Sequence, residues 1–181
     1  MKDFIIKLAR KTIENYVKSG KRIAIPDDFP EELNEKRGVF VTIYKKSTKQ
    51  LRGCIGIPYP ELSLIKALIQ AAVSACSDPR FQPLKPEELK DVFIEVSVLT
   101  NPEPLKTKDF VKEIEIGRHG LIIRKGLQGG LFLPKVPIEQ NWNIEEYLEN
   151  LCYKAGLTGD SWLDPNSKLF KFEAEVFEEK L

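Results

Sequence analysis

The sequence predicts an α+β fold, in which a mainly antiparallel sheet is packed with helices and a smaller second lobe is present. Hairpin loops join strand-like runs, the helical segments are clustered, and the strict β-α-β order of a parallel sheet is missing. The chain has 181 residues, of which 42% are hydrophobic and 30% are charged, so it can bury a sizeable core. We expect one domain over residues 1–181, with a possible lobe boundary near 101–112, where Asn101, Pro102 and Pro104 interrupt the chain.

The first half of the chain is predicted to contain two helices and three strands. Apolar residues at helical spacing follow Asp3 and stop at Gly20, which predicts a helix from about 3 to 19. Residues 39–44 form a continuous β-branched and aromatic run, and 51–57 are their expected hairpin partner. A helix over 61–76 has one narrow polar stripe, so we expect protein on most of its sides. Residues 92–100 alternate as a strand.

The second half is expected to form the smaller lobe. Residues 113–116 and 121–124 flank Gly117-Arg118-His119-Gly120, a pattern typical of a hairpin, and a short strand is expected at 131–133. Asn143, with Glu146 three residues later, resembles a capping box, and the helix that it opens stops at Gly156. A closing strand is expected over 168–177, and its predicted inward residues are Phe170, Phe172, Ala174 and Val176.

Composition and motif content exclude several classes of protein. The three cysteines lack the short spacing of zinc or redox motifs, and His119 is the only histidine, so we expect no metal and no cofactor. Phosphate loops, serine-hydrolase elbows, zinc-protease motifs and EF-hand loops are missing from the sequence. No apolar run approaches membrane-spanning length, and the charged amino terminus is no secretory signal, which predicts a cytoplasmic protein.

The most informative stretch is the strand expected over 51–57. It directs Arg52, Cys54 and Gly56 to one side, with Arg52 and Cys54 about 6.6 Å apart. A nearby cation favours the thiolate, which is the reactive form of cysteine. Gly53 and Gly56 weaken a strand, and close approach by a ligand or another backbone is a common reason to tolerate them. We therefore expect a catalytic Cys54 and a substrate site that includes Arg52, Gly53 and Gly56; the alternative is a buried cysteine beside a β-bulge.

Two further segments could contribute to the same site. Asp78 and Arg80 follow the helix over 61–76, and they either form a surface ion pair or direct both charges into a pocket beside Cys54. In the second case Asp78 has a catalytic role, in orienting Arg80 or moving a proton, and Arg80 binds an anionic substrate. Glu95, on the less apolar face of its strand, is either a solvent-facing charge or a second carboxylate at the site.

The remaining candidate residues have simpler interpretations. Cys76 and Cys152 lie on apolar helix faces and are expected to be packing residues. His119 precedes a glycine in a tight turn, so a turn role is favoured over a general base. A basic cluster that leads into the glycine-cysteine strand could steer an anionic ligand or nucleic acid, or could be a solvated hairpin tip; its members are Lys45, Lys46, Lys49 and Arg52.

These residues also resemble a known family. Leu51-Arg52-Gly53-Cys54-Ile55-Gly56 is similar to the hexapeptide signature of the AMMECR domain family. Residues 38–42, 78–81, 95–99, 133–136 and 154–157 follow in the family's order, so the resemblance extends along the chain. It implies an α+β fold with one main antiparallel sheet, helices packed around it and a smaller lobe. It implies no established activity; roles suggested for the family are RNA modification and a system with Memo-type and radical-SAM proteins as partners.

Three functional hypotheses therefore stay open. In the first, the protein is an enzyme in which Cys54 is a nucleophile and the arginines bind an anionic or RNA-related substrate. In the second, it is a non-catalytic binding module for a small anion, an RNA or a protein partner. In the third, the Arg-Gly-Cys strand is structural and Arg52 ties loops together.

Overall fold

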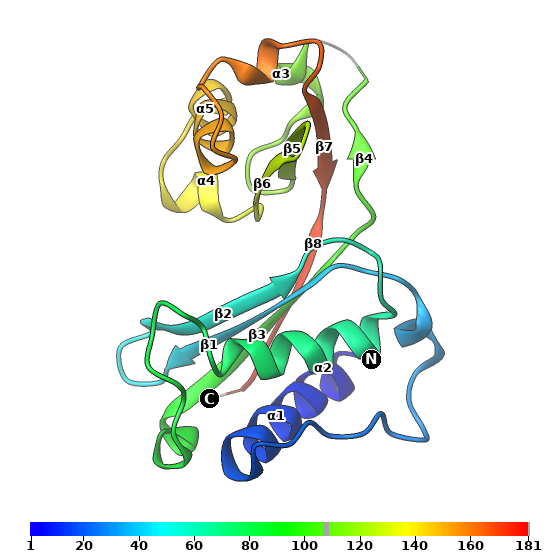
Figure 1. The fold of residues 1–181 in the computed structure, drawn as a ribbon, viewed down its shortest axis with the longest axis vertical. Helices are drawn as coiled ribbons and strands as arrows, with labels where there is room; N and C mark the ends of the chain where they lie inside the picture. The colour runs from blue at the N-terminus through cyan, green and yellow to red at the C-terminus, as the bar shows by residue number, and fades with distance from the viewer. Residues whose placement is uncertain (107–108, 181) are drawn as a thin grey trace. The chain divides into compact units, whose positions relative to one another are not determined.

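Two four-stranded antiparallel sheets organise the part of the chain that the computed structural model describes, residues 1–106 and 109–180 (Figure 1). One sheet belongs to a unit formed by Met1–Leu99 and the chain from Glu175 onward, and the other to a unit formed by Thr100–Ala174. The α+β class and the mainly antiparallel pairing predicted from the sequence are confirmed. Asn101 and Pro102, where a boundary was expected, lie at the start of the second unit.

The first unit places two helices against one face of its sheet (Figure 1). The sheet has the order β2-β1-β3-β8, so β2 is an edge strand. Its strands are β1 (Val39–Lys45), β2 (Leu51–Ile57), β3 (Val92–Leu99) and β8 (Ala174–Glu178). The helices are α1 (Lys2–Ser19) and α2 (Leu64–Ala75), with short 3₁₀ turns η1 (Glu31–Asn34) and η2 (Pro86–Asp91).

Helix α2 is the central helix of this unit, as its narrow polar stripe predicted. Nine of its twelve residues are buried, among them Leu64, Leu68 and Ala72, and they pack against α1, β1 and β2. The helix begins at Leu64 rather than at residue 61, because Ser63 at its N-cap has extended backbone angles. Burial of these side chains is the main source of stability for the first unit.

Arg10 binds the residue that follows the carboxyl-terminal strand β8. Arg10 of α1 donates from Nε to Glu179 Oε1 at 2.8 Å and from Nη2 to Glu179 Oε2. The same guanidinium donates to the carbonyls of Leu89 and Val92, and the main chain of Glu179 pairs with Ile94 of β3. Arg10 therefore ties α1, the end of η2 and the end of the chain together.

The second unit has the strand order β4-β7-β5-β6 and a core of its own. Its strands are β4 (Glu103–Pro104), β5 (Gly120–Lys125), β6 (Gln128–Phe132) and β7 (Lys168–Phe172). The helices are α3 (Phe110–Glu113), α4 (Val136–Glu139), α5 (Ile144–Lys154) and the 3₁₀ turn η3 (Ser161–Leu163). Asn143 and Glu146 form the predicted capping box of α5.

Two predictions for this half of the chain are wrong. Residues 113–116 form no strand, because α3 ends at Glu113 and a turn follows; the hairpin is β5–β6 instead. The strand predicted over 168–177 is interrupted at Glu173, so β7 belongs to one sheet and β8 to the other. The interruption shifts the alternation of buried and exposed side chains by one residue, so that Phe177 is buried whereas Val176 is exposed.

Candidate functional site

Arg52 lies at a β-bulge, and this bulge changes the geometry expected for the candidate site. In the β1–β2 pairing, Ile43 faces Gly53 and Tyr44 faces Leu51, so Arg52 is the extra residue and has no partner on β1. A bulge locally breaks the alternation of side chains and re-aims one of them. The prediction that Arg52 and Cys54 share one face rested on unbroken alternation, which the bulge contradicts, and the Arg52 side chain turns to Glu88 instead. The separation of about 6.6 Å stays a prediction.

The guanidinium of Arg52 is bound by a carboxylate of η2. Its Nε donates to Glu88 Oε1 at 2.8 Å, its Nη2 donates to Glu88 Oε2 at 2.9 Å, and Nη2 also reaches the carbonyl of Pro83 at 3.4 Å. This two-pronged pair holds the pKa of Glu88 below its usual range. Arg52 is buried, and its charge also acts on the Cys76 thiol in the interior. The contacts of Arg52 are those of a residue that ties η2 to the sheet.

The two glycines of the predicted site are close to other parts of the protein. A Cβ on Gly53 would lie 2.4 Å from the carbonyl oxygen of Ala75, the last residue of α2. A Cβ on Gly56 would lie 2.3 Å from the ring of Phe40 on the neighbouring strand. Packing within the chain therefore explains why neither Gly53 nor Gly56 carries a side chain. Substrate binding by Gly53 and Gly56 stays a prediction.

Asp78 and Arg80 hold the main chain of Cys54 on the open edge of β2. The Cys54 amide donates to Asp78 Oδ2 at 2.8 Å, and Arg80 Nη2 donates to the Cys54 carbonyl at 3.2 Å. Arg80 also donates to Asp78 through Nη2 at 2.7 Å and through Nε at 3.0 Å. The Asp78 side chain is 1% exposed, whereas that of Arg80 is 58% exposed. We call this arrangement the Asp78–Arg80 clamp.

The clamp strongly favours the ionised form of Asp78. Hydrogen bonds from Arg80, and one from the Cys54 amide, lower the pKa of Asp78 to about 2 although burial opposes this. The carboxylate in turn raises the pKa of the Arg80 guanidinium. At neutral pH the clamp therefore carries one buried negative charge and one positive charge whose outer side is open to solvent. A carboxylate with so low a pKa is a poor proton acceptor.

The side chain of Cys54 projects from the sheet next to Thr42 of β1. Because the Cys54 amide and carbonyl point away from β1, Cys54 and Thr42 form a non-hydrogen-bonded pair, in which side chains lie closest. The Thr42 hydroxyl donates to Cys54 Sγ at 3.2 Å. Thr42 is 3% exposed and Cys54 is partly exposed. Sequence reasoning missed Thr42, since the bulge conceals the register that pairs these residues.

Glu95 belongs to the same cross-strand row. It pairs with Thr42 across β1 and β3, so the side chains of Cys54, Thr42 and Glu95 lie on one face of three adjacent strands. Glu95 is partly buried and takes part in a polar interaction of its own. The register thus brings Glu95 to the face that carries the sulfur, as the site prediction requires. A role in binding substrate stays a prediction.

The other two cysteines and the histidine are in different surroundings. Burial raises the pKa of the Cys76 thiol to about 12, and burial also raises that of Cys152. His119 belongs to the second unit, where its Nδ1 accepts a hydrogen bond from the Glu115 amide at 2.9 Å. Burial, with the charges of Lys171 and Arg118, lowers the pKa of His119. Cys76 and Cys152 are packing residues, as expected.

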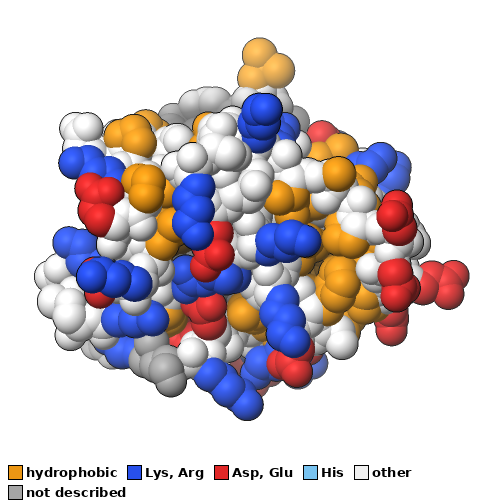
Figure 2. All heavy atoms as spheres, turned by 90° about the horizontal axis from the view of Figure 1, so that it is seen from below, with side chains coloured by type: hydrophobic (Ala, Val, Ile, Leu, Met, Phe, Trp, Pro, Cys, Tyr) orange, Lys and Arg blue, Asp and Glu red, His pale blue; other side chains and the backbone are white. Residues whose placement is uncertain are grey.

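Charged side chains are mixed over the face drawn in Figure 2. Lys and Arg alternate there with Asp and Glu, and hydrophobic side chains lie between them. In the predicted basic cluster, Lys49 Nζ lies 4.4 Å from the ring centroid of Phe93, and the main-chain amide of Lys46 donates to the Asp91 carbonyl.

Among the residues described, no group of His, Cys, Asp and Glu could hold a metal ion, and no helix is long and apolar enough to span a membrane.

Comparisons with known proteins match nearly the whole chain. The family model described as AMMECR1 matches residues 6–177. A protein of Methanocaldococcus jannaschii is 51% identical over 97% of this chain and 89% of its own length. A protein of Pyrococcus abyssi is 50% identical over 98% of this chain and 90% of its own length. The crystal structure of an uncharacterised protein from Pyrococcus horikoshii has a TM-score of 0.92 and 48% identity, and covers 99% of this chain and 91% of that one.

Proposed function

We propose that this chain, which belongs to the AMMECR1 family, is a cysteine-dependent enzyme in which Cys54 is the reacting group and Arg80 binds an anionic part of the substrate. One observation carries this proposal. Arg52, Gly53 and Gly56 of the hexapeptide each have a packing partner within the chain. Cys54 is partly exposed, and its Sγ accepts a hydrogen bond from the Thr42 hydroxyl, so the hexapeptide holds one sulfur that is within reach of solvent.

Solvent exposure favours Cys54 over the other two cysteines as the reacting thiol. Cys76 and Cys152 are 2% and 0% exposed, and burial raises the pKa of both, so that they react slowly in the folded protein. Cys54 is partly exposed, and its backbone is fixed on both sides of the Cα by the Asp78–Arg80 clamp. A fixed backbone reduces the number of orientations that the sulfur can take relative to a bound substrate.

In this proposal Asp78 and Arg80 have different roles. Asp78 is a positioning residue: it accepts from the Cys54 amide and from Arg80, and its low pKa argues against a proton-transfer role. Arg80 offers the exposed side of a guanidinium to an anion, and the planar guanidinium matches carboxylate and phosphate oxygens. Glu95 lies on the same face as the sulfur and would contact the substrate there.

Alkylation with two reagents tests this assignment. Iodoacetamide is neutral and iodoacetate is anionic; each forms a carbon–sulfur bond as iodide leaves and the thiol proton passes to solvent. We expect one fast-reacting thiol in the native protein, lost in Cys54→Ser. The iodoacetate-to-iodoacetamide rate ratio should exceed that of a small model thiol, and Arg80→Gln should reduce it roughly two- to five-fold, as one charge at short range in water predicts. Arg22→Gln, which removes an exposed charge elsewhere in the first unit, is the matched control.

Two results would contradict the proposal. The first is labelling of Cys54 no faster than the model thiol with either reagent. The second is a rate ratio that is the same in Arg80→Gln, in Arg22→Gln and in the unmodified chain. Mass spectrometry of the labelled peptide identifies the reacting cysteine in each case.

A non-catalytic binding module is the second candidate, because Arg80 is held by a buried carboxylate and exposed to solvent without any need for chemistry at Cys54. The ligand would be a small anion, an RNA end or a protein partner such as the Memo-type and radical-SAM proteins suggested for the family. Phosphate binding that survives in Cys54→Ser favours this module. A binding constant that falls linearly with salt on a log–log scale would indicate a nucleic acid.

A further inference from the structure

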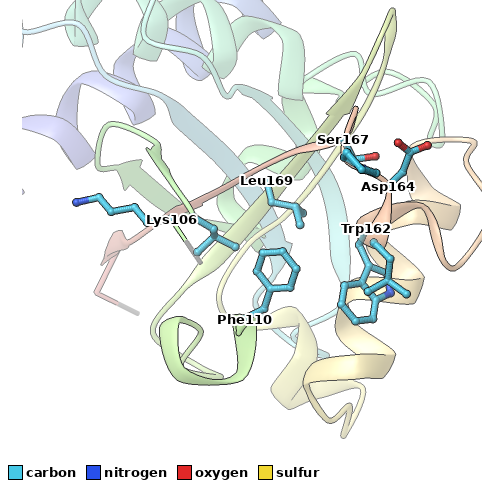
Figure 3. A pocket seen from close by; sticks show the side chains of 9 residues that line it. Lys106, Phe110, Trp162, Asp164, Ser167 and Leu169 are labelled. Carbon is cyan, nitrogen blue, oxygen red and sulfur yellow. The ribbon is translucent and has the colours of Figure 1, made fainter. Parts of the chain in front are cut away.

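The second unit contains a cavity that is separate from the residues discussed above. Its volume is about 210 Å³, and all of its lining residues belong to Thr100–Ala174. Figure 3 shows Phe110, Trp162 and Leu169 around it, with Asp164 and Ser167 at one end. Lys106 also lines the cavity, but its amine is directed away from the aromatic rings (Figure 3). A cavity of about 150 Å³ holds a benzene molecule, so this one holds a group of that size or slightly larger.

Two aromatic rings form a corner of this cavity. The ring centroids of Phe110 and Trp162 are 5.7 Å apart and their planes meet at 72°. In this edge-to-face contact the edge of one ring covers part of the face of the other, and the uncovered ring faces carry negative electrostatic potential. A cation placed in the corner is attracted to both rings, and Trp is the most favourable of the aromatic residues for this contact.

The carboxylate of Asp164 lines the same cavity as the two aromatic rings. Asp164 is held by a hydrogen bond from the Asn166 amide at 2.8 Å and by an ion pair with Lys125 Nζ at 2.7 Å. The Lys125 contact and the Asn166 amide lower the pKa of Asp164, so it is ionised at neutral pH. Lys125 does not line this cavity; it lines a neighbouring hollow with Thr158 and Asp160. The carboxylate therefore separates the two hollows and can attract a positive charge from the aromatic side.

The turn that carries Trp162 is fixed before any ligand arrives. Ser167 Oγ donates to the Ser161 carbonyl at 2.6 Å, and the hydroxyls of Thr158 and Ser161 lie 3.0 Å apart. These bonds hold η3, so little conformational freedom is lost when a guest fills the corner. Leu169, which is 7% exposed, adds an apolar wall suited to alkyl groups.

We propose that this cavity binds the alkylated ammonium group of a small organic cation. The two ring faces and Asp164 recognise the positive charge, and Leu169 contacts the alkyl substituents. The carboxylate and the ring faces disfavour a small anion. A neutral guest of the same shape gains the apolar contacts but not the attraction of a positive charge to the rings and to Asp164.

A pair of isosteric probes tests this proposal. Choline and 3,3-dimethylbutan-1-ol have the same shape, but only choline carries a charge. We expect choline to shift the indole N–H resonance of Trp162 in NMR spectra and to bind roughly 3- to 30-fold more tightly than the alcohol, the range given by cation–π attraction. Trp142→Phe, which changes a tryptophan outside the cavity, assigns the resonance and should leave binding unchanged.

Four variants examine the individual parts of the site. Phe110→Leu, which keeps the Trp162 reporter, should reduce the preference for choline. Trp162→Leu should abolish it, as followed by calorimetric titration because the reporter resonance is lost. Asp164→Asn should weaken choline binding, whereas Lys125→Gln, which removes the competing cation, should strengthen it. The proposal is overturned if the alcohol binds as tightly as choline, if neither probe shifts Trp162 at about 50 mM, or if Asp164→Asn and Lys125→Gln leave choline binding unchanged.

Discussion

The Asp78–Arg80 clamp makes a quantitative prediction about the stability of the first unit. Asp78→Asn keeps the size of the side chain but removes its charge. The asparagine has one acceptor oxygen, and its NH₂ group would face either the Cys54 amide or the Arg80 guanidinium, both of which are donors. One partly buried donor would thus lose its partner, which costs about 1 kcal/mol.

The loss of charge adds to this cost. The pKa of Asp78 falls from 3.8 to about 2, and each pKa unit corresponds to about 1.4 kcal/mol, so the ionised clamp contributes about 2 kcal/mol. Because 58% of the Arg80 side chain is exposed, solvent screening reduces this to about 1 to 2 kcal/mol. We therefore expect Asp78→Asn to lower the free energy of unfolding by about 2 to 3 kcal/mol at pH 7.

The charge contribution must disappear at acidic pH. The folded pKa of Asp78 lies below the unfolded value, so its stabilisation is complete above about pH 5 and is lost as the pH falls towards 2. About half is gone at pH 3. The difference in unfolding free energy between the unmodified protein and Asp78→Asn should therefore be about 0.5 to 1 kcal/mol smaller at pH 3 than at pH 7.

Urea unfolding followed by circular dichroism at 222 nm measures this difference, because α1 and α2 supply most of the helix in the first unit. Tryptophan fluorescence is unsuitable, since Trp142 and Trp162 both belong to the second unit. Glu61→Gln, at an exposed carboxylate, is the control and should be nearly neutral at both pH values. An equal effect of Asp78→Asn at pH 3 and pH 7 would refute the electrostatic account of the clamp.

Three further substitutions follow from the same contacts. Gly53→Ala should destabilise the first unit by about 3 kcal/mol in urea unfolding, because its Cβ would lie 2.4 Å from the last carbonyl oxygen of α2. Arg52→Lys should cost about 1 to 2 kcal/mol through loss of the two-pronged carboxylate pair, but should leave the alkylation rate of Cys54 unchanged. Glu179→Gln should weaken the ion pair with Arg10. If the opening free energy of β8 falls by about 1 kcal/mol, hydrogen exchange of its amides should become roughly five-fold faster.

Each of these three predictions has a result that would contradict it. Gly53→Ala of unchanged stability would mean that the edge strand moves freely away from α2. A clear drop in the alkylation rate of Cys54 in folded Arg52→Lys would mean that Arg52 acts on the Cys54 thiol, contrary to the geometry of the bulge. Unchanged exchange in β8, together with faster exchange elsewhere, would mean that Glu179 acts through another contact.

Most of the elements could be predicted because their patterns are local. The narrow polar stripe of α2, the β-branched run of β1 and the capping box of α5 each depend on residues within one element, and the structure has all three. The interruption at Glu173 could not be predicted in this way. The residues on both sides favour strands, and what separates β7 from β8 is that each pairs with a different sheet.

The candidate site was only partly predictable for a related reason. Period-two alternation placed Arg52 beside Cys54, and one extra residue in β2 turned Arg52 to Glu88 instead. The contact between Thr42 and Cys54 depends on the same register. The corner of Phe110 and Trp162 joins residues that are far apart in the sequence, and no local pattern marks either as part of a cavity.

The position of Cys54 on an edge strand decides how a partner can reach it. An edge strand normally offers free amides and carbonyls to which another strand can add. At Cys54 both groups are already bound, the amide by Asp78 and the carbonyl by Arg80, so strand addition at this point would have to break the clamp. The sulfur points along a different direction, away from the edge and towards Thr42. A strand that paired with β2 at this point would therefore displace the clamp without contacting the sulfur directly.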